Sequence, residues 1–206
     1  MSWFVAPLYD LLMRRTEAAC LRPWRAEILM SARGRVLEIG AGTGANLGLY
    51  PEAVEALTLL EPDGGMRRQL HKKLKQHQSH SPEIVDASAE ALPFDDASFD
   101  TVVSTLVLCT VPEPLTALGE LYRVLRRGGA LLYLEHVHAA DNPSRARWQR
   151  RFNPLWRSLM GGCELTRDTA TAMEQAGFTV ETCVRESMRK ALPLVRPTIR
   201  GLARRD

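Results

Sequence analysis

The chain has 206 residues, of which 45% are hydrophobic and 25% are charged, and its formal net charge is only +3. A chain of this length buries enough surface for one compact domain, so we expect a single domain over residues 1–206. So small a net charge gives little attraction to a phosphate backbone, and we expect no nucleic acid among the partners.

Apolar residues recur at helical spacing from residue 9 to residue 30, with a break at Pro23 that suits the first turn of a new helix. We therefore expect two helices within residues 1–33, forming an N-terminal lid. After Gly34 the pattern changes to short apolar runs separated by helical stretches. This alternation is typical of an α/β fold with a buried, mostly parallel sheet. The predicted strands, in a core over residues 34–137, are 35–39, 57–60, 84–85, 101–105 and 130–137.

Helices are predicted between these strands at residues 44–49, 66–76 and 114–125. The last part of the chain, residues 138–206, begins with an Arg- and Trp-rich stretch at 142–160 and continues with a predicted helix at 166–175. A final pair of strands is predicted at 180–186 and 198–203, with Pro193 and Pro197 in the connection.

The most distinctive segment reads VLEIGAGTG and covers residues 36–44. We interpret it as a strand that enters a tight turn and then a helix. Glycines let the backbone approach a ligand closely, and a helix N-terminus offers free N–H groups to a carboxylate or phosphate. With Ala45 the segment also satisfies the dinucleotide pattern GxGxx(G/A), so a nicotinamide cofactor stays open at this point.

An acidic residue, Glu61, follows the glycine segment at a spacing that is typical of nucleoside binding. Glu61 closes the apolar run 58–60 and lies 21 positions after Gly40. A carboxylate at the tip of that strand can accept both ribose hydroxyls of a nucleoside, and its spacing from the glycines favours this role over that of a surface acid at a strand end. The glycine segment and Glu61 together predict a nucleoside cofactor without saying which one.

Further motifs follow in a fixed order, namely AEALPF at 89–94, SFD at 98–100, LYRVL at 121–125 and a Gly pair at 128–129. With ExGxGxG at 38–44 and with Glu61, this order resembles the class I S-adenosylmethionine-dependent methyltransferases over about residues 34–137. The resemblance implies an enzyme that uses S-adenosyl-L-methionine. It also implies a Rossmann-like sheet of seven strands with the last one antiparallel, helices on both faces, and a site at the carboxyl ends of the strands.

By this resemblance, the glycine turn would hold the methionine part of the cofactor, Glu61 its ribose, and the backbone of Ala89 and Glu90 the edge of its adenine. Glu38 would orient the turn and the amino group of the cofactor. The implied cofactor-binding residues are Glu38, Gly40, Ala41, Gly42, Gly44, Asn46, Glu61, Pro62, Ser88, Ala89, Glu90 and Thr105. The chain departs from many relatives at Ser88, where they have an Asp, and its nearest acid is Asp86.

Three further stretches look like the methyltransferase-like group that includes the human alkyl-thiol S-methyltransferases. They are Leu106-Val107-Leu108-Cys109, Glu135-His136-Val137 and the segment 163–167, CELTR. This finer resemblance implies a small, lipophilic acceptor such as a thiol, bound by helices of residues 138–206. N-methylation of a phospholipid head group and C-methylation of a quinone ring remain open, as does a regulatory protein that binds the cofactor without catalysis.

The candidate catalytic residues are Tyr9 on the lid and Glu135 and His136 at the end of the fifth strand. Methyl transfer is an in-line displacement, so alignment matters most, and a thiol needs no strong base because it is partly ionised near neutral pH. His136 is the side chain best suited to move a proton, although a structural role is the more common one for such a residue. We expect Cys109 to pack against the cofactor rather than react.

Location and other partners follow from weaker signals. The four cysteines are far apart with no His grouped at metal-ligand spacing, which favours reduced thiols, a cytoplasmic location and no metal. The N-terminus lacks the charge order of a secretory signal, and the longest uncharged stretch is 12 residues. The Arg- and Trp-rich segment 145–157 is interpreted as a cover for the site, with peripheral membrane contact as the alternative.

Overall fold

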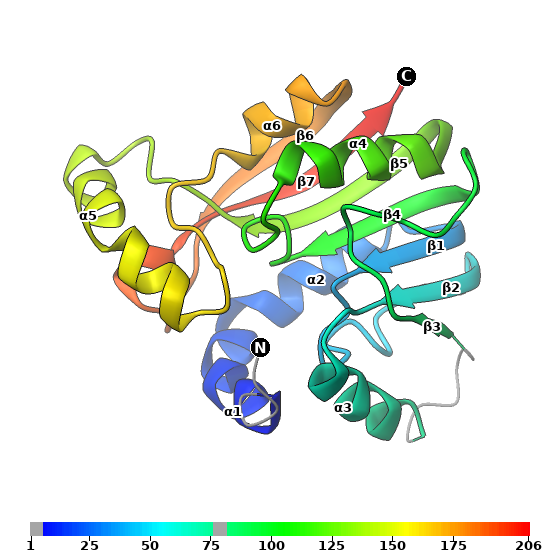
Figure 1. Cartoon of the computed structure of the whole chain (residues 1–206), viewed down its shortest axis with the longest axis horizontal. Helices are drawn as coiled ribbons and strands as arrows, with labels where there is room; N and C mark the ends of the chain where they lie inside the picture. The colour runs from blue at the N-terminus through cyan, green and yellow to red at the C-terminus, as the bar shows by residue number, and fades with distance from the viewer. Residues whose placement is uncertain (1–5, 76–81) are drawn as a thin grey trace.

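The computed structural model describes residues 6–75 and 82–206, with side chains from residue 10 onward. Within these residues seven strands form one sheet in the order β3-β2-β1-β4-β5-β7-β6 (Figure 1). Their bounds are Gly34–Ile39 (β1), Val54–Leu60 (β2), Glu83–Val85 (β3), Phe99–Thr105 (β4), Leu125–His136 (β5), Phe178–Ser187 (β6) and Pro197–Arg205 (β7). Strand β7 pairs antiparallel with both β5 and β6, whereas β1 to β5 pair in parallel. The predicted α/β sheet with one antiparallel strand is thus confirmed.

Helices cover both faces of the sheet, as the alternating pattern predicted. On one face, α4 (Pro114–Val124) and α6 (Thr169–Gln175) pack on a core that includes Tyr133. On the other, α2 (Arg22–Leu29) and α3 (Gly64–Leu74) pack on a second core that includes Leu132. Neighbouring residues of β5 therefore point into different cores, which is why this strand is one long apolar run.

The N-terminal segment contains the two predicted helices, α1 (Ala6–Thr16) and α2, but no loop separates them. A π-helical segment, Glu17–Leu21, joins them, and Pro23 lies in the first turn of α2 as expected. Helix α1 reaches the turn that follows β1, where Asp10 accepts a hydrogen bond of 2.5 Å from the Thr43 hydroxyl and pairs with Lys73 of α3 at 2.6 Å. These contacts join the lid to the glycine segment.

The predicted helix at residues 44–49 is wrong. Residues 42–48 form consecutive turns instead. Gly42, Gly44 and Gly48 have positive φ angles of 58°, 82° and 75°, which a right-handed helix does not allow. The free N–H groups at this place therefore belong to turns and not to a helix N-terminus.

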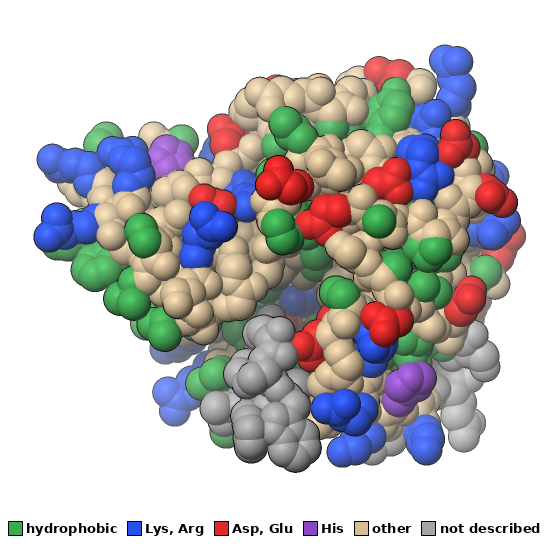
Figure 2. Space-filling model, in the orientation of Figure 1, with side chains coloured by type: hydrophobic (Ala, Val, Ile, Leu, Met, Phe, Trp, Pro, Cys, Tyr) green, Lys and Arg blue, Asp and Glu red, His purple; other side chains and the backbone are tan. Residues whose placement is uncertain are grey.

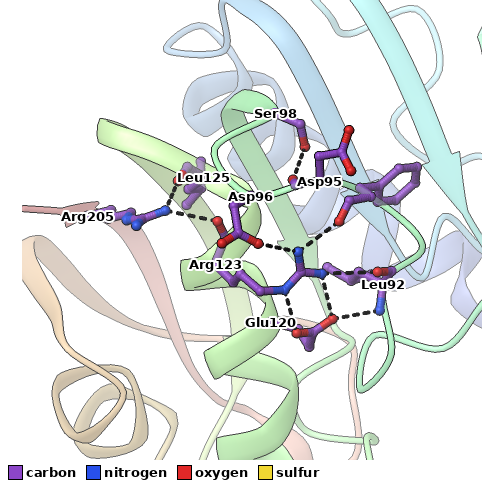
Figure 3. A network of polar contacts seen from close by, with 9 residues as sticks. Leu92, Asp95, Asp96, Ser98, Glu120, Arg123, Leu125 and Arg205 are labelled. Carbon is purple, nitrogen blue, oxygen red and sulfur yellow. Dashed lines mark hydrogen bonds and ion pairs between the residues drawn. The ribbon is translucent and has the colours of Figure 1, made fainter.

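The loop that follows β3 is fixed to α4 by Arg123 (Figure 3). The Arg123 guanidinium donates to the carbonyls of Leu92 and Phe94 and pairs with Glu120 at 2.8 Å, while Glu120 accepts from the Leu92 N–H. Because these bonds satisfy backbone groups that no strand or helix serves, the loop keeps one conformation beside the sheet.

Helix α5 (Pro143–Leu159) lies beyond the carboxyl ends of the strands, away from the two helical layers (Figure 1). Buried Gln149 anchors it by accepting from the Ala139 N–H and donating to the carbonyls of Val137 and Leu194. No helix in the described ranges, 6–75 and 82–206, has both the length and the apolar character to cross a membrane.

Candidate functional site

The glycine turn after β1 contains three glycines whose surroundings are of two kinds. A Cβ at Gly40 would lie 2.5 Å from a Val107 methyl carbon, and one at Gly44 would lie 2.6 Å from a Leu47 methyl carbon. A Cβ at Gly42 would meet only a backbone oxygen at 3.8 Å. Packing therefore excludes side chains at Gly40 and Gly44, while the space beside Gly42 is open to a ligand.

Glu61 lies next to this open space, at the carboxyl end of β2. Its carboxylate accepts one hydrogen bond of 2.8 Å from the Gly42 N–H and another of 2.8 Å from the Asp63 N–H. Burial raises the pKa of Glu61, and the two N–H donors oppose that shift. Each carboxylate oxygen keeps a further lone pair, so the group can accept hydroxyl donors without giving up the turn.

Glu38, at the end of β1, is buried beneath the same turn. One carboxylate oxygen accepts from the Tyr50 hydroxyl at 2.5 Å and the other from the Asn46 amide at 2.9 Å. Burial raises the pKa of Glu38 to about 7, against the opposing effect of these bonds and of Arg25. The buried carboxylate therefore supports the turn from its protein side, through Asn46 and Tyr50.

Arg25 of α2 completes the buried network. Its guanidinium donates to the Thr105 hydroxyl at 2.6 Å and to the Asn46 amide oxygen at 3.1 Å, and it pairs with Glu17 at 3.1 Å. The Asn46 amide also donates to Thr105. Strands β1 and β4, the glycine turn and the lid helices are thereby joined through polar atoms.

The loop after β3 presents the predicted residues Ser88, Ala89 and Glu90. The Ser88 hydroxyl donates to the Glu90 carboxylate and accepts from the Glu90 N–H at 3.3 Å, while Ala89 is buried. The second carboxylate oxygen of Glu90 is buried without a hydrogen-bond partner. Such an acceptor is expensive to bury and is satisfied only when a donor arrives.

At the ends of β4 and β5, Glu135 organises the loop that follows β4. It is fully buried and accepts from the Ser104 hydroxyl at 2.7 Å, the Val107 N–H at 3.1 Å and the Cys109 N–H at 3.2 Å. Burial raises its pKa, and these donors oppose the shift. With its carboxylate occupied by the loop, Glu135 is suited to position other groups.

His136 points away from Glu135 and meets two thiols. Its Nε2 lies 2.8 Å from the Cys163 sulfur, and Cys109 belongs to the same cluster. The neighbouring Cys109 thiol lowers the pKa of Cys163 to about 4, with a further contribution from His136 and against the effect of burial. The pKa of Cys109 is raised by Cys163 and by burial.

The structure thus places most of the predicted site residues at the carboxyl ends of the strands, in two groups. The first surrounds the glycine turn and Glu61, and the second surrounds His136. Pro62 is exposed, and the side chain of Tyr9 lies outside the part of the chain whose side chains the structure describes.

Sequence reasoning missed the site roles of Arg25, Tyr50 and Cys163. Arg25 and Tyr50 lie outside every motif, and Cys163 is 27 positions from His136. A charged residue inside the apolar stripe of the second N-terminal helix was the one available signal for Arg25.

Comparisons with known proteins agree on one family. Residues 37–133 match the model of a methyltransferase domain. The chain is 36% identical to the human thiol S-methyltransferase TMT1A over 84% of its own length and 71% of that protein. It spans 59% to 63% of the length of the rat, human and mouse thiol S-methyltransferase TMT1B. It is 33% identical to the phosphatidylethanolamine N-methyltransferase of Cereibacter sphaeroides over 66% of each chain. A solved SAM-dependent methyltransferase of Thermotoga maritima superposes with a TM-score of 0.70, at 21% identity, over 99% of this chain and 97% of that one.

The raised pKa of Glu38 predicts a pH effect on stability. In the unfolded chain a glutamate ionises near its ordinary value of 4.5, and in the folded chain Glu38 ionises at about 7. Ionisation of Glu38 therefore does not affect stability below pH 4.5, and it lowers the free energy of unfolding progressively as the pH rises from there to 7. Glu38→Gln lacks this loss, so we expect its stability advantage over the wild type to increase by roughly 2 kcal/mol between pH 5 and pH 8.

Urea unfolding at the two pH values measures this gain, with the exposed Glu113→Gln as the control. Equal pH responses of the wild type and Glu38→Gln would show that Glu38 is already ionised at low pH.

Proposed function

The chain belongs to the class I S-adenosylmethionine-dependent methyltransferases, and on that premise we propose that it methylates the sulfur of a small, lipophilic thiol. The observation that carries the proposal is the 36% identity to a thiol S-methyltransferase over 84% of the chain. The chemistry of the site supports it, because the carboxylate at the acceptor side, Glu135, is occupied by the Ser104 hydroxyl of β4 and by two N–H groups of the loop after β4. An acceptor that ionises by itself suits such a site best.

The residues around the glycine turn fit S-adenosylmethionine. Gly42 leaves open space at the turn, Glu61 keeps lone pairs for two ribose hydroxyls, and Glu90 has a buried oxygen that lacks a donor. An adenine amino group is a donor of the required kind. We assign Gly40, Ala41, Gly42 and Gly44 to the methionine part of the cofactor, with Glu38, Asn46 and Thr105 holding the turn from beneath.

The cofactor, when bound, supplies a methyl group on a positively charged sulfur that a nucleophile displaces in line. The protein's part is to align the acceptor and to exclude water. Glu135 acts as a positioning residue, since it fixes the backbone of Val107 and Cys109 at the end of β4. We assign His136 and Cys163, which contact one another, to the acceptor side of the site.

We further propose that α5 rests on a membrane surface and receives lipophilic acceptors there. Trp148, Phe152, Leu155 and Leu159 recur at helical spacing and are 52%, 40%, 58% and 70% exposed. Exposed arginines accompany them at positions 147, 150, 151 and 157. Figure 2 shows these two kinds of side chain gathered on the lobe at the left, where α5 lies in Figure 1. An apolar stripe flanked by cations is suited to an anionic lipid surface.

Removing the Glu61 carboxylate is expected to weaken the binding of S-adenosylmethionine. Glu61→Ala should lower the affinity at least about tenfold, because it removes charge-assisted hydrogen bonds to the ribose. Titration calorimetry measures the change. Glu55→Ala, an exposed acid near the other end of β2, serves as the control and should bind normally. Unchanged affinity in Glu61→Ala would refute the assignment of the ribose site.

An acceptor panel tests the reaction itself. With radiolabelled S-adenosylmethionine, small alkyl thiols should be methylated at least about tenfold faster than phosphatidylethanolamine or a demethylated quinone. The thiol is partly ionised near neutral pH, whereas the other acceptors must be activated. Transfer to the lipid amine or to the quinone alone would select one of those reactions, and cofactor binding without any transfer would indicate a regulatory protein.

Vesicle flotation tests the membrane surface. The protein should float with vesicles that contain phosphatidylserine and should be released as the salt concentration rises, because screening weakens the arginine contacts. Leu155→Glu should reduce binding at least about fivefold, whereas Leu115→Glu on α4, with 51% exposure, should not. No binding of the wild type at low salt would refute this part of the proposal.

A further inference from the structure

Three side chains from distant parts of the sequence converge beside the ends of β4 and β5. The sulfurs of Cys109 and Cys163 and a ring nitrogen of His136 all lie within 4.8 Å of one another. Cys109 and His136 are buried, and Cys163 is partly exposed. Two thiols and one imidazole are a ligand set that zinc favours.

The backbone brings these ligands together independently of any ion. The Glu164 N–H donates to the Cys109 carbonyl at 2.8 Å, so the two cysteine-bearing loops are joined directly. Gly162, with a φ of 92°, allows this approach, because a Cβ there would lie 3.3 Å from the Thr110 carbonyl oxygen. Arg167 completes the connection by donating to the carbonyls of Leu108 and Val111.

The spacing of the three ligand atoms is close to that of a metal centre. Ligands around a tetrahedral zinc ion are about 3.6 Å apart for a sulfur and a nitrogen and about 3.8 Å apart for two sulfurs. The His136 and Cys163 atoms, now 2.8 Å apart, must therefore separate by less than about 1 Å to admit the ion.

The charges of the surroundings also favour a cation. Two thiols, the Glu135 carboxylate beneath the Cys109 N–H and one imidazole are packed into a largely buried volume. A dication between the two sulfurs would offset the negative charge of both thiolates, and metal binding itself deprotonates a coordinating thiol.

We propose that Cys109, His136 and Cys163 bind one zinc ion and leave its fourth coordination position open to the acceptor. Sites with three protein ligands and an open position are the ones that zinc enzymes use for catalysis. Resting on the proposed function, this assigns a role to the ion. The acceptor thiol loses its proton to solvent and binds the zinc as a thiolate. Its sulfur then forms the new bond to the methyl carbon as the sulfonium–carbon bond breaks, and the neutral thioether leaves.

Metal analysis of the purified full chain, prepared under reducing conditions without chelators, tests the site. We expect about one zinc per chain in the wild type and in Cys183→Ser, an exposed cysteine on β6 that serves as the matched control. Cys163→Ser and His136→Ala should retain at least about fivefold less.

A cobalt titration of the metal-free wild type keeps the test independent of how the variants fold. Bound Co²⁺ should give thiolate-to-cobalt charge-transfer absorption, and an added alkyl thiol should shift that spectrum, whereas an alkyl amine should not. Absence of both stoichiometric zinc and the charge-transfer absorption would overturn the proposed site. An unshifted spectrum on thiol addition would overturn the open position.

The metal site and the proposed function can fail separately. A protein that holds zinc but methylates no thiol would refute the acceptor while leaving the site intact. Thiol methylation by a protein free of zinc and cobalt binding would do the reverse.

Discussion

The arrangement of the site depends on one buried polar network. Glu38 beneath the glycine turn is bonded to Tyr50 and Asn46, and Asn46 is bonded through Thr105 and Arg25 to the second helix of the chain. Each member is buried or nearly so, and losing one would leave its partners unsatisfied at low dielectric. The turn therefore keeps its shape because several elements hold it at once.

The topology of the sheet brings the cofactor side and the acceptor side to one edge. Parallel strands end on the same side, so the residues that follow β1, β2, β4 and β5 meet there although they lie far apart in the sequence. The acid of β2 meets the glycine turn, and the loop after β4 is held by Glu135 of β5. Helices α1 and α5 both lie on the side of the sheet where these strands end (Figure 1).

The sequence predicted the sheet well because apolar runs are local patterns that are visible in short windows. The glycines and Glu61 are visible in the same way, and their assignment to parts of the cofactor stays a prediction. The helix at 44–49 was predicted wrongly, since positive φ angles at Gly44 and Gly48 depend on packing that a window does not contain. The Cys163 contact with His136 and the burial of Arg25 depend on tertiary structure in the same way, so no spacing rule could have found them.

The contacts of Asp10 with Thr43 and Lys73 determine how strongly α1 is held to the rest of the fold. Asp10 and Lys73 are both partly open to solvent, with side chains 45% and 34% exposed. Exposed ion pairs of this kind contribute about 0–1 kcal/mol, so breaking this contact between α1 and α3 costs little free energy. Helix α1 is therefore attached to the glycine turn through a contact that is well formed in the structure and energetically weak.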